Sequence, residues 1–410
     1  MLLALAPLAL LAVPQQVLIV DAQGGGNFTD LPAAVAAASS GDVLLVREGD
    51  YSGFQTSGVA LSIQAHPAAI EAPRILGSVR LTQVPLGETF LLDGFEVEAF
   101  DQQVPVLVTL NPGSIRIQDC LLKAHPTQFG DFPASGMFAQ TSDDVAVADS
   151  TLEGGDMLAF LGYAGGETGG TGGAGITINQ AQVAVHRSIL RGGEGGDLPN
   201  GGIGGQGGPG ATIFGGRLHL SQCFLRAGQS GDTGDGIFPG LCANGGPGLS
   251  VLSTNSRVSQ LGTTIVGGDP GAYITAPCTI GGQIGPAVSG DLRTIPGVPR
   301  ALIVDGVVLE GTPVTTRYRG KPGDLAARLV STSSAFLWRP VRKGALLIDT
   351  QLPQSILIQG TLDGEGTLEV TETFGLPAGV QASTLYLQGL FVGVDGVTNL
   401  ANPRAMTIVR

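Results

Sequence analysis

The chain has 410 residues and a net charge of −13 at pH 7; 66 residues are Gly, 13% are charged and 5% are aromatic. So few charged and long side chains do not suit a surface of helices, while 43% hydrophobic residues exclude wholesale disorder. Nucleic acid and anionic membranes attract basic surfaces. The acidic balance therefore predicts neither as a partner and leaves cations and neutral polymers.

The first residues have the pattern of a secretory signal. Met1–Val13 is an apolar run too short to span a bilayer comfortably, and polar Gln15 and Gln16 follow it. No Lys or Arg precedes the run and no small-x-small cleavage site is clear, so a buried first strand is the alternative. We predict a signal peptide over residues 1–14, a secreted or cell-surface protein, and no membrane span in the mature chain.

A short strand, an Ala-rich helix and a second strand are expected next. Residues 31–38 carry the helix pattern, Thr29 or Asp30 can cap it, and Pro32 suits its first turn. Such a helix can cover the end of a stack of β-coils, which otherwise exposes its core and unpaired strand edges.

One eight-residue pattern recurs along the middle of the chain, with apolar residues at its first, third and eighth positions and a small residue at its sixth. The copies are Ile115–Leu122, Val145–Leu152, Val183–Leu190, Leu218–Leu225 and, more faintly, Val258–Ile265. Each copy reads as two short strands joined by a bend, and a third strand precedes each of the last four. These are Met137–Ala139, Ile176–Ile178, Ala211–Ile213 and Leu249–Val251. Repeats of this kind bury their apolar side by stacking.

Three strands per coil with loops of variable length resemble a right-handed parallel β-helix of the pectate-lyase-like and pectin-methylesterase-like superfamily. The order strand, Gly-Asn-Phe-Thr, helix, strand, Gly-x-Tyr near the amino end is similar to that of pectin methylesterases. Their catalytic motifs Gln-Ala-Val, Gln-Asp-Thr-Leu and Asp-Phe-Ile-Phe-Gly are missing. Gln118–Leu121 and Asp131–Phe132 match them only in part, and we interpret Asp119 as a bend residue, like Asp149 and Arg187 in later copies.

The resemblance places the substrate cleft of the lyases over the first strand of each coil. Here strand alternation turns only four non-titratable side chains outward on that strand, namely Phe138, Thr177, Thr212 and Ser250. Because hydrolysis needs paired carboxylates and β-elimination needs a base, we predict no catalytic residue in this cleft.

Three Gly-rich loops, residues 165–173, 192–210 and 228–236, are expected to project from one edge of successive coils as an acidic rim. The predicted binding residues are Glu167, Glu194, Asp197, Asp232 and Asp235, and a calcium site would use Asp232 and Asp235. Solvated loops or polyglycine-like packing are the alternatives, because glycine suits both. We predict no cofactor other than this calcium.

The other titratable residues fit structural roles. One column of successive coils should stack Lys123, Glu153, Arg191 and Arg226, and His186 and His219 fit solvated strand positions better than metal ligands. Cys242 and Cys278 lie in loops of neighbouring coils and are predicted to form a disulfide. Two copies of the repeat lie between those that hold Cys120 and Cys223, so these two residues are too far apart to form a disulfide with each other.

The repeat stops near residue 290. We predict a β-helix over residues 15–290, a Pro-rich linker with edge strands over 291–324, and a small antiparallel β-sandwich-like domain over 325–410. Its expected strands are Ala345–Ile348, Ser355–Ile358, Thr367–Val370, Thr384–Gln388 and Met406–Val409. The single Trp338 is expected in the core.

The functional hypothesis is a structural or binding protein that associates with a polysaccharide or an extracellular-matrix component through the Gly-rich rim. The alternative is a polysaccharide lyase or glycoside hydrolase that uses loop carboxylates. Convergence of those carboxylates around a groove would favour the enzyme, because paired acids must reach one bond.

Overall fold

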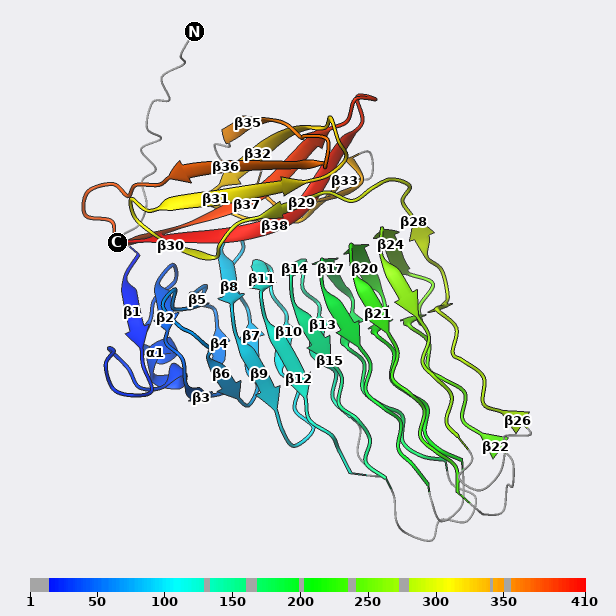
Figure 1. Ribbon diagram of the computed structural model, residues 1–410. Coiled ribbons are helices and arrows are strands. Elements are labelled where there is room, and N and C mark those ends of the chain that lie inside the picture. The colour runs from blue at the N-terminus through cyan, green and yellow to red at the C-terminus, as the bar shows by residue number, and fades with distance from the viewer. Residues whose placement is uncertain are drawn as a thin grey trace.

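The computed structural model describes residues 15–128, 133–159, 168–198, 203–234, 241–272, 280–339, 342–349 and 355–410. The chain forms a parallel β-helix followed by a module of mainly antiparallel sheets (Figure 1). This confirms the fold class predicted from the repeats. The predicted signal peptide, residues 1–14, lies outside the described residues.

Three parallel sheets, A, B and C, form the walls of the β-helix. The strands of sheet A, in order, are β1 Val17–Val20, β2 Val43–Val46, β5 Ser62–Ala65, β8 Thr89–Asp93, β11 Ser114–Gln118, β14 Asp144–Ala148, β17 Ala181–His186, β20 Gly216–Ser221, β24 Ser256–Leu261 and β28 Arg293–Thr294. Those of sheet B are β3 Asp50–Ser52, β6 Arg74–Leu76, β9 Glu96–Ala99, β12 Leu121–Ala124, β15 Thr151–Glu153, β18 Ile189–Arg191, β21 Phe224–Arg226 and β25 Thr264–Val266. Those of sheet C are β4 Gln55–Ser57, β7 Val79–Thr82, β10 Val106–Thr109, β13 Met137–Gln140, β16 Ile176–Asn179, β19 Ala211–Ile213, β23 Leu249–Val251 and β27 Val288–Ser289.

In the middle coils the chain turns sharply between sheets A and B at a residue in the left-handed region. Asp119, Asp149 and Arg187 occupy this bend with φ of 51°, 52° and 50°. Asp119 is therefore a bend residue, as the sequence predicts. The inward side chains stack in register, so that Ile117, Val147 and Val185 follow one another and are at most 1% exposed. This stacking buries the apolar side of every copy.

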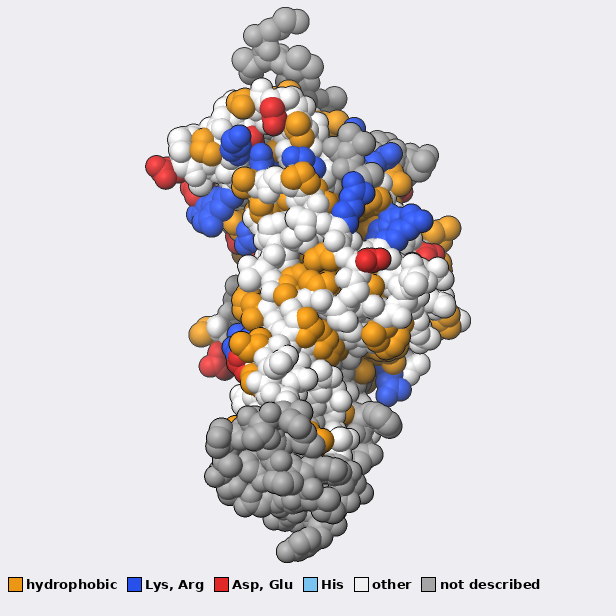
Figure 2. Space-filling model, turned by 90° about the vertical axis from the view of Figure 1, so that its right-hand side faces the viewer, with side chains coloured by type: hydrophobic (Ala, Val, Ile, Leu, Met, Phe, Trp, Pro, Cys, Tyr) orange, Lys and Arg blue, Asp and Glu red, His pale blue; other side chains and the backbone are white. Residues whose placement is uncertain are grey.

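Helix α1, Leu31–Ala37, covers the amino-terminal end of the β-helix, as predicted. The Asp30 side chain accepts hydrogen bonds from the N–H groups of Leu31 and Ser52, both at 2.8 Å, and caps the helix. At the other end the described residues include no helix, and hydrophobic side chains are visible on the surface in Figure 2. Leu252 and Ile284 are 57% and 68% exposed there.

The carboxy-terminal module packs two sheets face to face. The first sheet holds β29 Ala301–Ile303, β31 Pro313–Arg319 and β36 Thr367–Thr373; the second holds β30 Val307–Leu309, β38 Thr398–Val409, β37 Ala382–Val392, β32 Leu325–Ser331 and β35 Ser355–Thr361. A hairpin adds β33 Leu337–Arg339 and β34 Gly344–Leu346. Strands β29, β30 and β31 come from residues 291–324, so this segment pairs with the module.

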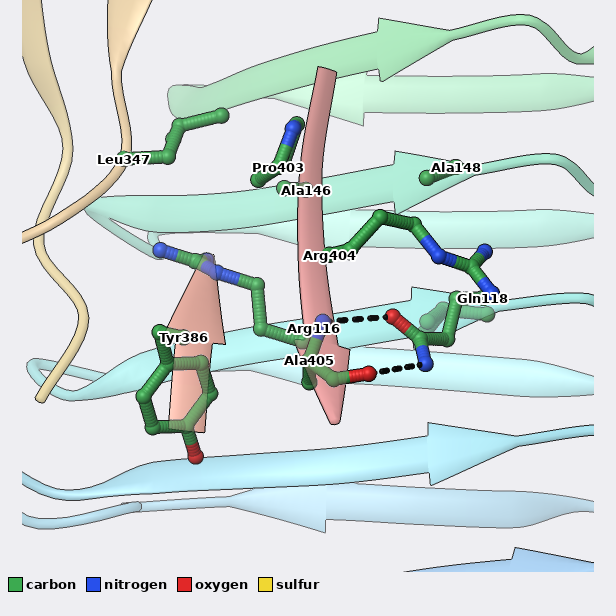
Figure 3. A pocket seen from close by; sticks show the side chains of 10 residues that line it. Arg116, Gln118, Ala146, Ala148, Leu347, Tyr386, Pro403, Arg404 and Ala405 are labelled. Atoms are coloured by element: carbon green, nitrogen blue, oxygen red, sulfur yellow. Dashed lines mark hydrogen bonds between the residues drawn. The ribbon is translucent and has the colours of Figure 1, made fainter. Parts of the chain in front are cut away.

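The module lies along the outer face of sheet A (Figure 1). The Gln118 side chain donates to the Ala405 carbonyl at 2.9 Å and accepts from the Ala405 N–H at 3.0 Å (Figure 3). Arg404 reaches the bend carboxylates of Asp119 at 2.5 Å and Asp149 at 3.1 Å. The space left between these side chains is about 10 Å³, room for one water at most. This contact is a packed interface rather than a ligand cavity.

Candidate functional site

The Gly-rich loops form an ordered two-layered array with a period of three residues. We call the described residues between sheets B and C the glycine blade: 154–159, 168–175, 192–198, 203–210, 227–234, 243–248, 267–272 and 282–287. The Gly192 N–H donates to the Arg226 carbonyl of the next coil at 2.9 Å, and the Gly193 N–H donates across the layers to the Gly173 carbonyl at 2.8 Å. Gly195 and Gly196 repeat these two directions. Every third residue, such as Glu194, can therefore carry a side chain.

The close approach of the backbones explains the glycines. A Cβ added to Gly193 would lie 2.1 Å from the Gly155 carbonyl oxygen, and one added to Gly208 would lie 2.0 Å from that of Gly173. Only glycine fits such contacts. A three-residue period without hydrogen bonds inside a segment is that of the polyproline II helix. The described loops thus adopt the polyglycine-like packing that the sequence leaves open.

The side-chain positions of the blade stack into acidic columns beside sheet B. Backbone bonds align Asp156, Glu194, Gln229 and Asp269 in one column, and Asp197 with Asp232 in another. Asp156 Oδ1 accepts from the Glu194 N–H at 2.7 Å, and Asp197 Oδ1 accepts from the Asp232 N–H at 2.7 Å. These carboxylates satisfy the N–H groups that face outward from the array.

Three of the predicted binding residues, Glu194, Asp197 and Asp232, thus belong to one layer of the blade. Asp232 also uses its Oδ1, which accepts from the Ala272 N–H at 2.9 Å. Glu167 and Asp235 lie outside the described residues. Within the described ranges, no group of three or more His, Cys, Asp or Glu side chains is arranged to hold a metal ion.

A groove of about 640 Å³ runs where the blade meets the outer face of sheet B. It is lined by Lys123, Glu153, Arg191 and Arg226, which stack in the predicted column, and by Asp156 and Glu194 of the blade. Arg191 pairs with Glu153 at 2.8 Å, and Arg226 pairs with Asp269 at 2.8 Å. The groove therefore offers both hydrogen-bond donors and acceptors along successive coils.

One carboxyl group of the groove is electrostatically distinct. Burial, with the nearby Asp156 and Asp197 carboxylates, raises the pKa of Glu194 above its ordinary value. Aromatic rings add apolar surface nearby: Phe224, 38% exposed, lines the groove, and the His125 ring, also in its lining, stacks on Phe100 at 4.0 Å between centroids. An exposed ring beside polar groups suits ligands with both apolar and hydroxyl faces.

The outer face of sheet C carries the column considered as a cleft. Phe138, Thr177, Thr212 and Ser250 stack in register, and the last three are at most 9% exposed. The Thr177 hydroxyl lies 2.6 Å from that of Ser135. Thr177, Thr212 and Ser250 are thus buried by adjacent residues and do not form an open cleft.

The interpretation of His186 and His219 as solvated residues is wrong, because the module covers them. They are 3% and 1% exposed, and their rings meet edge to face at 5.7 Å. A sequence signal for this cover exists. The outward positions of sheet A hold apolar residues such as Leu91, Ala146 and Ala184, which a solvated face would not favour.

The cysteines fall into two kinds. Cys120 and Cys223 are free and buried, and burial raises the pKa of the Cys223 thiol to about 12. Cys242 is disulfide-bonded. Its predicted partner Cys278 lies outside the described residues, so this pairing stays a prediction.

No protein-family model and no curated protein matches the chain. One solved structure with partial similarity is a superoxide reductase (neelaredoxin) from Ignicoccus hospitalis, with 9% identity over 27% of this chain and 81% of that chain and a TM-score of 0.16. A score this low carries no argument about fold or function. Among the described residues, no helix has the length and apolar character needed to cross a membrane.

Proposed function

We propose that the protein is a secreted or cell-surface member of the pectate-lyase-like β-helix group that binds a polysaccharide, such as an extracellular-matrix glycan, in the groove between sheet B and the glycine blade. The groove itself carries this proposal. Its polar groups recur once per coil, at the strand spacing of about 4.8 Å. A linear polymer of sugar units can meet such rungs with successive hydroxyl groups.

The state of the carboxylates favours binding over catalysis. Asp156 accepts a backbone hydrogen bond and Glu153 is paired with Arg191, so both are held in fixed roles. Fixed polar groups lose little conformational entropy when a ligand binds. The Phe224 ring adds an apolar surface on which a sugar face can pack.

One observation favours the enzyme instead. Glu194 has a raised pKa and stands beside Asp156 in the blade, which is the arrangement of a general acid next to a second carboxyl group. A lyase or hydrolase with this pair is the second candidate, and calcium would then be a candidate cofactor near the acidic columns.

Affinity electrophoresis on a panel of polysaccharides, with and without calcium, tests the binding proposal. Phe224→Ala and Arg191→Gln should weaken retardation by about tenfold, the effect of losing a packed ring or a charged hydrogen bond. Arg319→Gln, an exposed change on the module, is the matched control. Retardation of both groove variants like the unmodified protein, or no retardation by any polysaccharide, would contradict the proposal.

The same panel separates the two candidates when products are measured. A binding protein leaves every polymer intact. New reducing ends indicate a hydrolase, and unsaturated ends indicate a lyase. If Glu194→Gln abolishes these products but the variant is still retarded by the polymer, the protein is an enzyme and the binding proposal gives way to the second candidate.

A further inference from the structure

A second polar cavity lies on the opposite side of the coils, where the β33–β34 hairpin crosses the last strands of sheet A. Its volume is about 460 Å³, and its lining includes Arg217 of β20, Arg257 of β24, Arg293 next to Asp291, and Trp338 of β33. Figure 2 shows Lys and Arg side chains gathered where the module meets this end of the β-helix.

The cavity has an excess of positive charge, because three arginines and one carboxylate, Asp291, line it. Arg217 and Arg257 are direct neighbours in the β20–β24 ladder, and Arg293 is opposite Ser259 in the next one. Among the described residues, none of these three arginines forms an ion pair. Like charges on adjacent strands repel, so the arrangement destabilises the empty protein.

Arg217 shows this repulsion most clearly. Its guanidinium lies over the Trp338 ring, 5.5 Å from the centroid. Burial, together with the neighbouring Arg257, lowers the pKa of Arg217 below its ordinary value. An anion placed between the two guanidinium groups would remove this cost.

A hydroxyl group in the lining also lacks a partner. Ser256 Oγ is buried and makes no hydrogen bond within the described part of the chain. Its neighbour on the same strand, Ser259, meets His219 Nδ1 at 3.2 Å. Alternation along β24 places Ser256 on the side of core residue Val258 and Arg257 on the other, so the arginines are the donors that an anion in the cavity can reach.

We propose that this cavity binds an oxyanion group, with Arg217, Arg257 and Arg293 as charged donors. Guanidinium groups bind carboxylate, sulfate and phosphate through paired N–H donors, so the three arginines select oxygen anions over halides. The cavity volume holds a ligand of monosaccharide size. Two sources fit this chemistry: a free inorganic anion, and the acidic group of a small saccharide.

Trp338 makes binding directly observable, because it is the only tryptophan of the chain. Its fluorescence is titrated with sulfate, phosphate and glucuronate at constant ionic strength, with glucose as the neutral control. Thermal unfolding with the same additives is the second readout. We expect a saturable change with at least one anion and none with glucose.

The variants assign the binding to the cavity. Arg257→Gln and Arg293→Gln, which change exposed side chains, should weaken binding by about tenfold, as expected for a lost charged hydrogen bond. Arg319→Gln should bind like the unmodified protein. Phe224→Ala, which changes the separate groove beside sheet B, should also keep the fluorescence response to the anion. The anion proposal can therefore stand even if the polysaccharide proposal fails.

Saturation by glucuronate alone identifies an acidic saccharide, and equal saturation by sulfate and phosphate identifies a free inorganic anion. The proposal is overturned if no anion gives a saturable response in either readout. It is also overturned if both arginine variants respond like the unmodified protein, because the effect would then lie elsewhere.

Discussion

Replacing Gly208 by Ala should destabilise the glycine blade. The new Cβ would lie 2.0 Å from the Gly173 carbonyl oxygen, whereas such contacts need at least 3.0 Å. The layers must therefore separate by about 1 Å, which strains the bonds of 2.8 Å from the Gly208 N–H to the Gly193 carbonyl and from the Gly228 N–H to the Gly208 carbonyl. Overpacking costs about 1–3 kcal/mol and each of the two weakened hydrogen bonds about 1 kcal/mol, so we expect a loss of about 3–5 kcal/mol.

Urea unfolding followed by circular dichroism measures the global effect. Amide hydrogen exchange measures the local one, which matters because stacked coils can open separately. Gly364→Ala is the matched control, since its added Cβ would meet nothing within 4 Å. Faster exchange should be confined to the blade around residue 208. An unfolding midpoint and exchange pattern equal to those of Gly364→Ala would refute the close packing.

Three further predictions concern the module. Burial lowers the pKa of His219 from 6.5 to about 4, so its neutral form stabilises the fold above pH 6.5 and this contribution is lost as the pH falls toward 4. The loss should reach about 3 kcal/mol, and unfolding of His219→Gln across this window should lack it. Arg404→Ala removes the ion pairs to half-exposed Asp119 and to Asp149, which keeps its pair with Arg187, so it should cost about 2 kcal/mol in urea unfolding, and no change would contradict these ion pairs. Deleting residues 290–410 should keep the β-sheet signal in circular dichroism, because the β-helix has its own core. The deletion should also expose sheet A, so that a hydrophobic dye binds. Loss of the β-sheet signal would show that the β-helix and the module fold as one unit.

The coil architecture is predictable because it depends on the spacing of apolar residues within short segments. Alternation, a bend residue and the small residue after it define two strands, and stacking of similar copies then fixes their register. The predicted segments Ala211–Ile213 and Leu249–Val251 coincide with β19 and β23. The helix cap at Asp30 follows from equally local chemistry.

The blade is harder to predict, although its signal is present. Gly192-Gly-Glu-Gly-Gly-Asp197 and Thr168-Gly-Gly-Thr-Gly-Gly173 repeat with a period of three, which belongs to neither helix nor strand. The acidic residues of these loops suggest a rim that binds ligands. The hydrogen bonds show instead that the Asp197 carboxylate accepts from a backbone N–H of the blade itself.

The position of the module depends on contacts between distant residues, which spacing cannot supply. Arg404 and Gln118 are far apart in the chain, yet their contacts with Asp119 and Ala405 join the module to the bends and strands of the β-helix. The same docking buries His219 and brings Trp338 over Arg217. The anion cavity therefore has no signature in either segment alone.

Net charge is a weak guide to small ligands in such a molecule. The value of −13 predicts that partners that meet the whole surface, such as nucleic acid, do not bind, because they sense the summed field. At physiological salt, however, screening reduces charge effects beyond about 8 Å. A small anion in the cavity would be close to Arg217, Arg257 and Arg293, whereas the acids of the blade belong to the other side of the coils. An acidic protein can thus have a local site for small anions. The prediction from net charge concerns only large polyanions.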